Sequence, residues 1–201
     1  INTCFENRKM SYYEHCRYRN FEGVVIVCAN FDDPDVTELM NSEIPVVTID
    51  YVHHNCTAVT SNNIQGMEDL VKYIYSQGHR KIAYIHGQEG SSVTRDRLAS
   101  FYRTIDELGL EIPDTYVRSA DYLETKGSAK QTKELLNLED PPTCIIYPDD
   151  TSLIGGRNVI IEMGLRIPQD ISIAGYDGTR MSQLLHPQLT TIRQDLSLIH
   201  I

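Results

Sequence analysis

The stretch Ile-Pro-Gln-Asp-Ile-Ser-Ile-Ala-Gly-Tyr-Asp-Gly-Thr, residues 167–179, indicates the kind of fold that this chain adopts. The apolar run from Ile171 to Ala174 follows a proline and precedes a glycine, which is typical of a strand buried on both faces. Asp177 lies just beyond this predicted strand. Ligands of open α/β sheets bind outside the carboxyl ends of the strands, so a carboxylate between two glycines is well placed to hold a small polar ligand. A surface turn is the alternative, since Asp-Gly is also a common turn pair.

Apolar runs of this kind alternate with helical patterns along the rest of the chain. The patterns predict strands near 24–28, 44–50, 81–87, 117–122 and 143–147, and helices near 34–40, 61–77, 97–108, 126–138 and 151–163. This alternation predicts an α/β fold with mostly parallel sheets flanked by helices. The number of strands and a loop-rich link after Gly78 favour two lobes, with residues 1–78 in the first and 79–189 in the second. Residues 190–201 are expected to return to the first lobe.

Composition narrows the possible functions. Of the 201 residues, 41% are hydrophobic and 23% are charged, as in ordinary globular proteins. The formal net charge of −10 argues against a nucleic-acid-binding surface within these residues. Five scattered cysteines without a Cys-x-x-Cys pair favour a reducing cytoplasm as the location. The sequence shows neither a long apolar segment of the kind that spans a membrane nor a signal peptide. Because the chain starts at Ile1 rather than Met, we expect a fragment of a longer protein.

Polar side chains gather at the predicted carboxyl ends of several strands: Asp149 and Asp150 after one, Asp177 after another, and Arg97 after a third. A small polyol or sugar requires such a set, because carboxylates accept from hydroxyls and an arginine fork donates to two oxygens. Tyr122 could cover the apolar face of the sugar. Simpler interpretations remain open: Asp150 capping the following helix, Arg97 lying on a helix surface, and Tyr122 packing in the core.

Enzyme and metal motifs are weak. The sequence contains no Gly-x-Ser-x-Gly elbow, Walker loop or Gly-x-Gly-x-x-Gly motif. Adjacent carboxylates such as Asp149 and Asp150 rarely face one reacting centre. The His53-His54-x-Cys56 cluster lacks a second pair of ligands, and Gly155-Gly156 within a helix favours close packing over phosphate binding. We therefore expect no enzymatic activity, no metal and no cofactor.

Four blocks occur in a specific order and spacing. They are Gln-Gly-His-Arg-Lys-Ile-Ala-Tyr-Ile at 77–85, Arg-Leu-Ala-Ser-Phe at 97–101, Gly-Leu-Arg-Ile-Pro-Gln-Asp-Ile-Ser-Ile-Ala-Gly-Tyr-Asp at 164–177, and Leu-Thr-Thr-Ile-Arg-Gln-Asp at 189–195. Together they resemble the ligand-binding core of LacI/GalR-type transcription regulators. That resemblance implies a two-lobed periplasmic-binding-protein type I fold, incomplete at both ends and lacking its first strand and helix. Residues 196–201 do not resemble the family's continuation.

The resemblance also implies roles for individual residues. Arg97 and Asp177 would hold effector hydroxyls, and Tyr122 falls where many members place a stacking aromatic. Asp149 replaces the asparagine of a common Asn-Asp pair, and Gln194 would lie near the ligand.

One position departs from the family pattern. The family's Asp-Asn pair, expected at the start of the first lobe's last helix, reads Ser61-Asn62 here. Either the effector differs, or Asn62 makes more of the contacts.

The function implied is a cytoplasmic, sugar- or nucleoside-responsive transcription regulator. A small sugar-like effector would bind between the lobes, and a helix-turn-helix preceding Ile1 would bind operator DNA in a homodimer. The alternative is a periplasmic sugar-binding protein of a transport or chemotaxis system, which shares the fold. The unpaired cysteines and the 190–195 segment favour the regulator.

Overall fold

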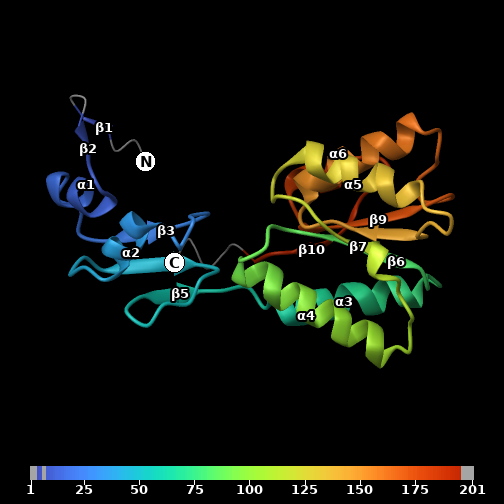
Figure 1. The fold of residues 1–201 in the computed structure, drawn as a ribbon, viewed down its shortest axis with the longest axis horizontal. Coiled ribbons are helices and arrows are strands. Elements are labelled where there is room, and N and C mark those ends of the chain that lie inside the picture. Colours follow the sequence, from blue (N-terminus) through green and yellow to red (C-terminus); the bar gives the residue numbers. More distant parts are fainter. Residues whose placement is uncertain (1–3, 6–7, 196–201) are drawn as a thin grey trace. The chain divides into compact units, whose positions relative to one another are not determined.

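The computed structural model describes residues 4–5 and 8–195, and it divides the chain into two compact units. Unit 1 is Ile1–Ser61 and unit 2 is Asn62–Ile201 (Figure 1). Both units combine parallel strands with helices, so the α/β class predicted from the sequence is confirmed. Among the described residues, no helix is both long and apolar enough to cross a bilayer.

Unit 1 contains short elements. In chain order they are β1 (Cys4–Phe5), β2 (Arg8–Lys9), α1 (Tyr12–Tyr18), β3 (Val24–Ile26), α2 (Pro34–Met40), β4 (Val46–Ile49) and β5 (Thr57–Val59). The described strands β3, β4 and β5 pair in that order, all parallel. Asp33 caps α2 by accepting from the Asp35 amide, and Pro34 occupies the first turn, where its missing N–H costs nothing. The core of the unit joins Val36, Leu39 and Met40 of this helix to Ile26 and Val46.

Unit 2 carries the longer elements. They are α3 (Asn63–Ser76), β6 (Ile82–His86), α4 (Ser92–Glu107), η1 (Asp114–Tyr116), β7 (Val117–Ser119), α5 (Thr125–Leu136), β8 (Cys144–Ile146), α6 (Asp150–Glu162), β9 (Ser172–Asp177), α7 (Arg180–Leu184) and β10 (Thr190–Arg193). Within the described residues its strands form one parallel sheet in the order β10-β9-β8-β6-β7.

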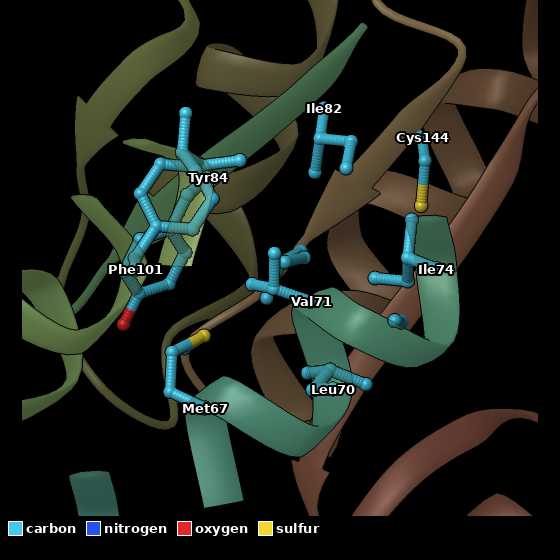
Figure 2. Close-up of a cluster of buried hydrophobic side chains, with 11 residues drawn as sticks. Met67, Leu70, Val71, Ile74, Ile82, Tyr84, Phe101 and Cys144 are labelled. Atoms are coloured by element: carbon cyan, nitrogen blue, oxygen red, sulfur yellow. The ribbon is translucent and has the colours of Figure 1, made fainter. Parts of the chain in front are cut away.

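This sheet is buried on both faces, as near-continuous apolar strands require. Helices α3 and α4 cover one face, and α5 and α6 cover the other (Figure 1). Alternate residues of β6 divide between the two cores: Ile82 and Tyr84 face α3 and α4, whereas Ala83 and Ile85 face α5 and α6. Figure 2 shows the first core, where the apolar side of α3 packs against β6 and Cys144.

The unit boundary differs from the one expected at residue 78. Helix α3 belongs to unit 2, because Met67, Leu70, Val71 and Ile74 are buried with β6 rather than in unit 1. The loop at residues 78–80 is a turn within unit 2. The segment 190–193, expected to return to the first lobe, pairs in parallel with β9 as the edge strand of the unit 2 sheet. Residues 196–201 lie outside the described residues.

Glycines end the helices where the sequence predicts. Gly78, Gly109 and Gly164 follow α3, α4 and α6 with φ of 95°, 64° and 76°, a conformation that costs other residues more.

The close packing expected at Gly155-Gly156 is confirmed. A Cβ on Gly155 would lie 2.0 Å from the Thr125 carbonyl oxygen of α5, and one on Gly156 would lie 2.0 Å from the Tyr147 hydroxyl. These two glycines let α5, α6 and Tyr147 approach one another.

Thiol labelling provides a test of which cysteine side chains are buried in the cores of the two units. Burial raises the pKa of the Cys144 thiol to about 12, and it also raises the pKa of Cys16 and Cys56, whereas Cys28 is exposed. Because the thiolate is the reacting species, we expect iodoacetamide at pH 8 to modify Cys28 first, and Cys16 and Cys144 only after unfolding. Peptide mass spectrometry over a time course measures the order. Rapid labelling of Cys144 in native protein would contradict the described core.

Candidate functional site

Arg97 is a buried charged residue of unit 2 that several segments of the chain hold in place. It lies on α4 with only 2% of its surface exposed. Its Nε donates to the Asn63 side-chain oxygen at 2.9 Å, and its Nη1 donates to the Pro148 carbonyl oxygen at 2.9 Å. Its guanidinium carbon lies 3.5 Å from the centroid of the Tyr176 ring. Contacts from α3, the end of β8 and β9 therefore fix this side chain in one orientation.

The charge of Arg97 has no carboxylate partner among the described residues. The ion pairs among the described residues of unit 2 all involve other residues. A guanidinium has five N–H groups, and the two bonds above use two of them. A buried guanidinium that is not paired with a carboxylate is costly, so this arrangement favours a ligand that supplies oxygen atoms.

Asn63 is a site residue that the sequence interpretation missed. It is buried, and its side-chain oxygen accepts from Arg97. Helical spacing carries the signal: Asn63 precedes Met67 by four residues and Leu70 by seven, so it lies on the buried stripe of α3.

The pair Ser61-Asn62 falls at the boundary between the two units. Asn62 is exposed and caps α3 by accepting from the Gln65 amide at 3.1 Å, as a capping residue should. Ser61 belongs to unit 1, where its amide donates to the Asp50 carboxylate at 3.1 Å. The effector contact predicted for this pair stays a prediction, and the residue that bonds Arg97 is Asn63, one position later in the sequence.

Asp149, rather than Asp150, caps α6. The Asp149 side chain is 1% exposed. Its Oδ1 accepts from the Ser152 amide at 2.8 Å, and its Oδ2 accepts from the Ser152 hydroxyl at 2.7 Å and the Leu123 amide at 2.9 Å. Since Leu123 follows Tyr122, this carboxylate also positions the loop that carries the predicted stacking ring.

Replacing Asp149 with alanine should lower the free energy of unfolding by about 2–3 kcal/mol, because the helix loses its cap and the Leu123 amide loses its acceptor. Urea denaturation followed by circular dichroism measures the loss. Asp121→Ala is the matched control, since that side chain is exposed in the same loop region. Equal stability of the two variants would contradict the capping role.

Asp150 has a different role, because its hydrogen bonds connect three segments of the chain. It is fully buried, and its carboxylate accepts from the Thr179 amide at 2.8 Å, the Thr179 hydroxyl at 3.0 Å and the Thr191 hydroxyl at 2.7 Å. These bonds connect the first turn of α6 to the turn after β9 and to β10. They hold the turn that carries Asp177.

Asp177 is the last residue of β9 and has a φ of 100°, which is unusual for a residue with a side chain. Gln194 holds it twice: the Gln194 side-chain amide donates to the Asp177 carboxylate at 2.9 Å, and the Gln194 backbone amide donates to the Asp177 carbonyl at 3.1 Å. The sequence-predicted residues Asp177 and Gln194 therefore lie together at the carboxyl edge of the sheet.

Tyr122 lies over the end of β6. A Cβ on Gly87 would be 2.1 Å from its ring, and its hydroxyl is 2.9 Å from the Thr94 hydroxyl. Burial raises the pKa of Tyr122; the Asp149 and Asp177 carboxylates raise it further, and Arg97 and Thr94 lower it. Tyr122 thus interacts electrostatically with three other predicted residues, Arg97, Asp149 and Asp177.

Comparison with known proteins identifies the family of this chain. The model of the periplasmic binding protein-like domain family matches residues 71–199. A crystal structure of a regulatory protein of the LacI family from Chloroflexus aggregans is 30% identical with a TM-score of 0.81, covering 93% of this chain and 68% of that one. The chain is a periplasmic binding protein-like domain of the LacI family. The family resemblance predicted from the sequence is therefore confirmed.

Other relatives of this LacI-family domain agree. A putative LacI transcriptional regulator from Bacillus cereus subsp. cytotoxis is 25% identical with a TM-score of 0.84, covering 93% of this chain and 67% of that one. The HTH-type transcriptional repressor PurR of Klebsiella pneumoniae is 29% identical over 93% of this chain and 56% of the repressor. PurR of Aliivibrio salmonicida is 27% identical over 94% of this chain and 57% of its own length. The LacI-family domain thus spans little more than half of these repressors.

Proposed function

We propose that this LacI-family domain binds a small, oxygen-rich effector at the carboxyl edge of the unit 2 sheet. The observation that carries the proposal is Arg97, a buried guanidinium without a paired carboxylate, held by Asn63, Pro148 and Tyr176. A ligand with hydroxyl, carbonyl or phosphate oxygens would accept its remaining N–H groups.

The neighbouring residues fit a sugar or nucleoside. Asp177, fixed by Gln194, offers carboxylate oxygens to adjacent hydroxyls. Tyr122 offers an aromatic face at the same edge. Asp149 already accepts three hydrogen bonds, so it supports the site by positioning α6 and the Tyr122 loop. Ser61 and Asn62 have no part in this proposal.

The whole protein is proposed to be a cytoplasmic transcription regulator that binds operator DNA as a homodimer. The support is the description of the relatives as HTH-type repressors and LacI regulators. A domain with a formal net charge of −10 is a poor DNA ligand, so the DNA-binding part would lie outside these residues. Effector binding would change DNA affinity by a coupling free energy, typically equivalent to roughly 5- to 150-fold.

The test uses the full-length protein. Thermal shift assays with D-ribose, D-glucose, D-ribose 5-phosphate, guanosine and hypoxanthine should give a saturable rise in Tm for at least one compound, followed by calorimetric titration. Footprinting on genomic fragments with and without that compound then measures the coupling. Effector binding that leaves DNA occupancy unchanged would contradict the regulatory function and favour a periplasmic binding role.

A further inference from the structure

Tyr84 has a buried hydroxyl with no hydrogen-bond partner among the described residues. It lies in β6, between β7 and β8 in the sheet, and its side chain is 0% exposed. Other buried tyrosines of unit 2 are satisfied: the Tyr116 hydroxyl donates to the Asp140 carbonyl at 2.8 Å, and the Tyr147 hydroxyl lies 2.7 Å from that of Thr132. Because native structures pair nearly all buried polar groups, the unpaired Tyr84 hydroxyl requires an explanation.

The position of Tyr84 connects it to the proposed site. Its ring packs against Phe101, with centroids 5.1 Å apart, and both belong to the core that includes Met67. In Figure 2 the oxygen atom of this cluster lies beside Phe101, away from Ile82 and Cys144. Arg97 precedes Phe101 by one turn of α4, and Asn63 precedes Met67 by one turn of α3. The hydroxyl therefore lies on the side of the core that borders the Arg97–Asn63 pair.

Residues of the proposed site also affect the pKa of Tyr84. Burial raises the pKa of Tyr84, Tyr122 and Tyr176 raise it further, and the Arg97 guanidinium lowers it. These three neighbours are the ring that covers Gly87, the ring stacked on Arg97, and Arg97 itself. Tyr84 thus interacts electrostatically with residues of the proposed site but is hydrogen-bonded to none of them.

We infer that the Tyr84 hydroxyl is a specificity-determining contact for the effector, made directly or through one ordered water. The inference rests on the proposed function of the Arg97 site. A ligand that presents a hydroxyl or carbonyl oxygen at this depth would satisfy a group that the ligand-free protein leaves unpaired. An analogue without that oxygen would leave it unpaired and bind more weakly.

Tyr84→Phe separates this role from a purely structural one, because the two effects have opposite signs. In the ligand-free full-length protein, removal of an unpaired buried hydroxyl should raise Tm. Affinity for the tightest binder among D-ribose, D-glucose, D-ribose 5-phosphate, guanosine and hypoxanthine should fall about three- to tenfold. Tyr147→Phe is the matched control: it removes an equally buried hydroxyl that is paired with Thr132, so Tm should fall and affinity should stay unchanged.

Equal affinity of wild-type protein and Tyr84→Phe for that compound would overturn the inference. A fall in Tm of the ligand-free variant as large as that of Tyr147→Phe would also overturn it, since the hydroxyl would then be as well paired without the ligand as that of Tyr147. Failure of the proposed function has a different result, in which the wild-type protein binds none of the five compounds of the thermal shift panel. That result would overturn both proposals, whereas equal affinities overturn only this one.

Discussion

Replacing Arg97 with alanine is expected to weaken effector binding by about 1.5–3 kcal/mol, or roughly 10- to 150-fold, because the ligand loses charge-assisted hydrogen bonds. In the proposed site this residue is the donor to the ligand, and Asn63, Pro148 and the Tyr176 ring hold it without using all its N–H groups. Arg97→Lys should recover only part of the affinity, because an ammonium keeps the charge but loses the planar fork and the stacking.

Arg95→Ala is the matched control for this measurement. Arg95 lies on the same helix two residues earlier, and 76% of its side chain is exposed beside Asp96. Calorimetric titration of both variants with the effector found for the wild type gives the comparison, and thermal unfolding of each ligand-free variant tests whether it folds. Unchanged affinity in a folded Arg97→Ala variant would remove Arg97 from the site.

Gly155→Ala is expected to destabilise unit 2 by about 3 kcal/mol or more, as severe overpacking does. The added Cβ would lie 2.0 Å from the Thr125 carbonyl oxygen and 2.7 Å from its carbonyl carbon. These atoms are backbone, so the contact cannot be relieved by a side-chain rotation. Helices α5 and α6 would have to separate, opening the core that contains Leu135, Leu153 and Ile160.

Asn158→Ala controls for the change in helix propensity, because Asn158 is an exposed position of α6. Urea denaturation should show a large fall in midpoint for Gly155→Ala and almost none for Asn158→Ala. Equal midpoints would mean that α5 and α6 do not pack as closely as described.

The sequence predicted the regular elements well because their signals are local. Apolar runs located the central strands of both sheets, and helix-ending glycines located the ends of three helices. The strand β5 was not predicted, since its three residues are exposed or half-buried and its flanks are polar. Periodicity could place α3 but could not assign it to a unit, because its apolar face would suit either core.

The site residues were predicted less completely than the helices and strands, because contacts between distant segments leave no local signal in the sequence. Arg97, Tyr122, Asp149 and Asp177 follow predicted strands or begin helices, so topology alone brought them together. The cap of α6 was predicted at Asp150 and is formed by Asp149, since neighbouring carboxylates differ only in the backbone angles that the fold imposes. Asn63 and Tyr84 resemble core positions in sequence, and only three-dimensional packing shows that one bonds Arg97 and the other borders it.

The assignment of α3 to unit 2 limits how effector specificity can be transferred between LacI-family relatives. A chimera whose crossover point follows Gly78 would combine an Asn63 from one parent with an Arg97 from another. It would also split the packing of Met67, Leu70 and Val71 against β6 between two parental sequences. A crossover before Asn62 moves the arginine, its amide partner and the core beneath them as one inherited piece.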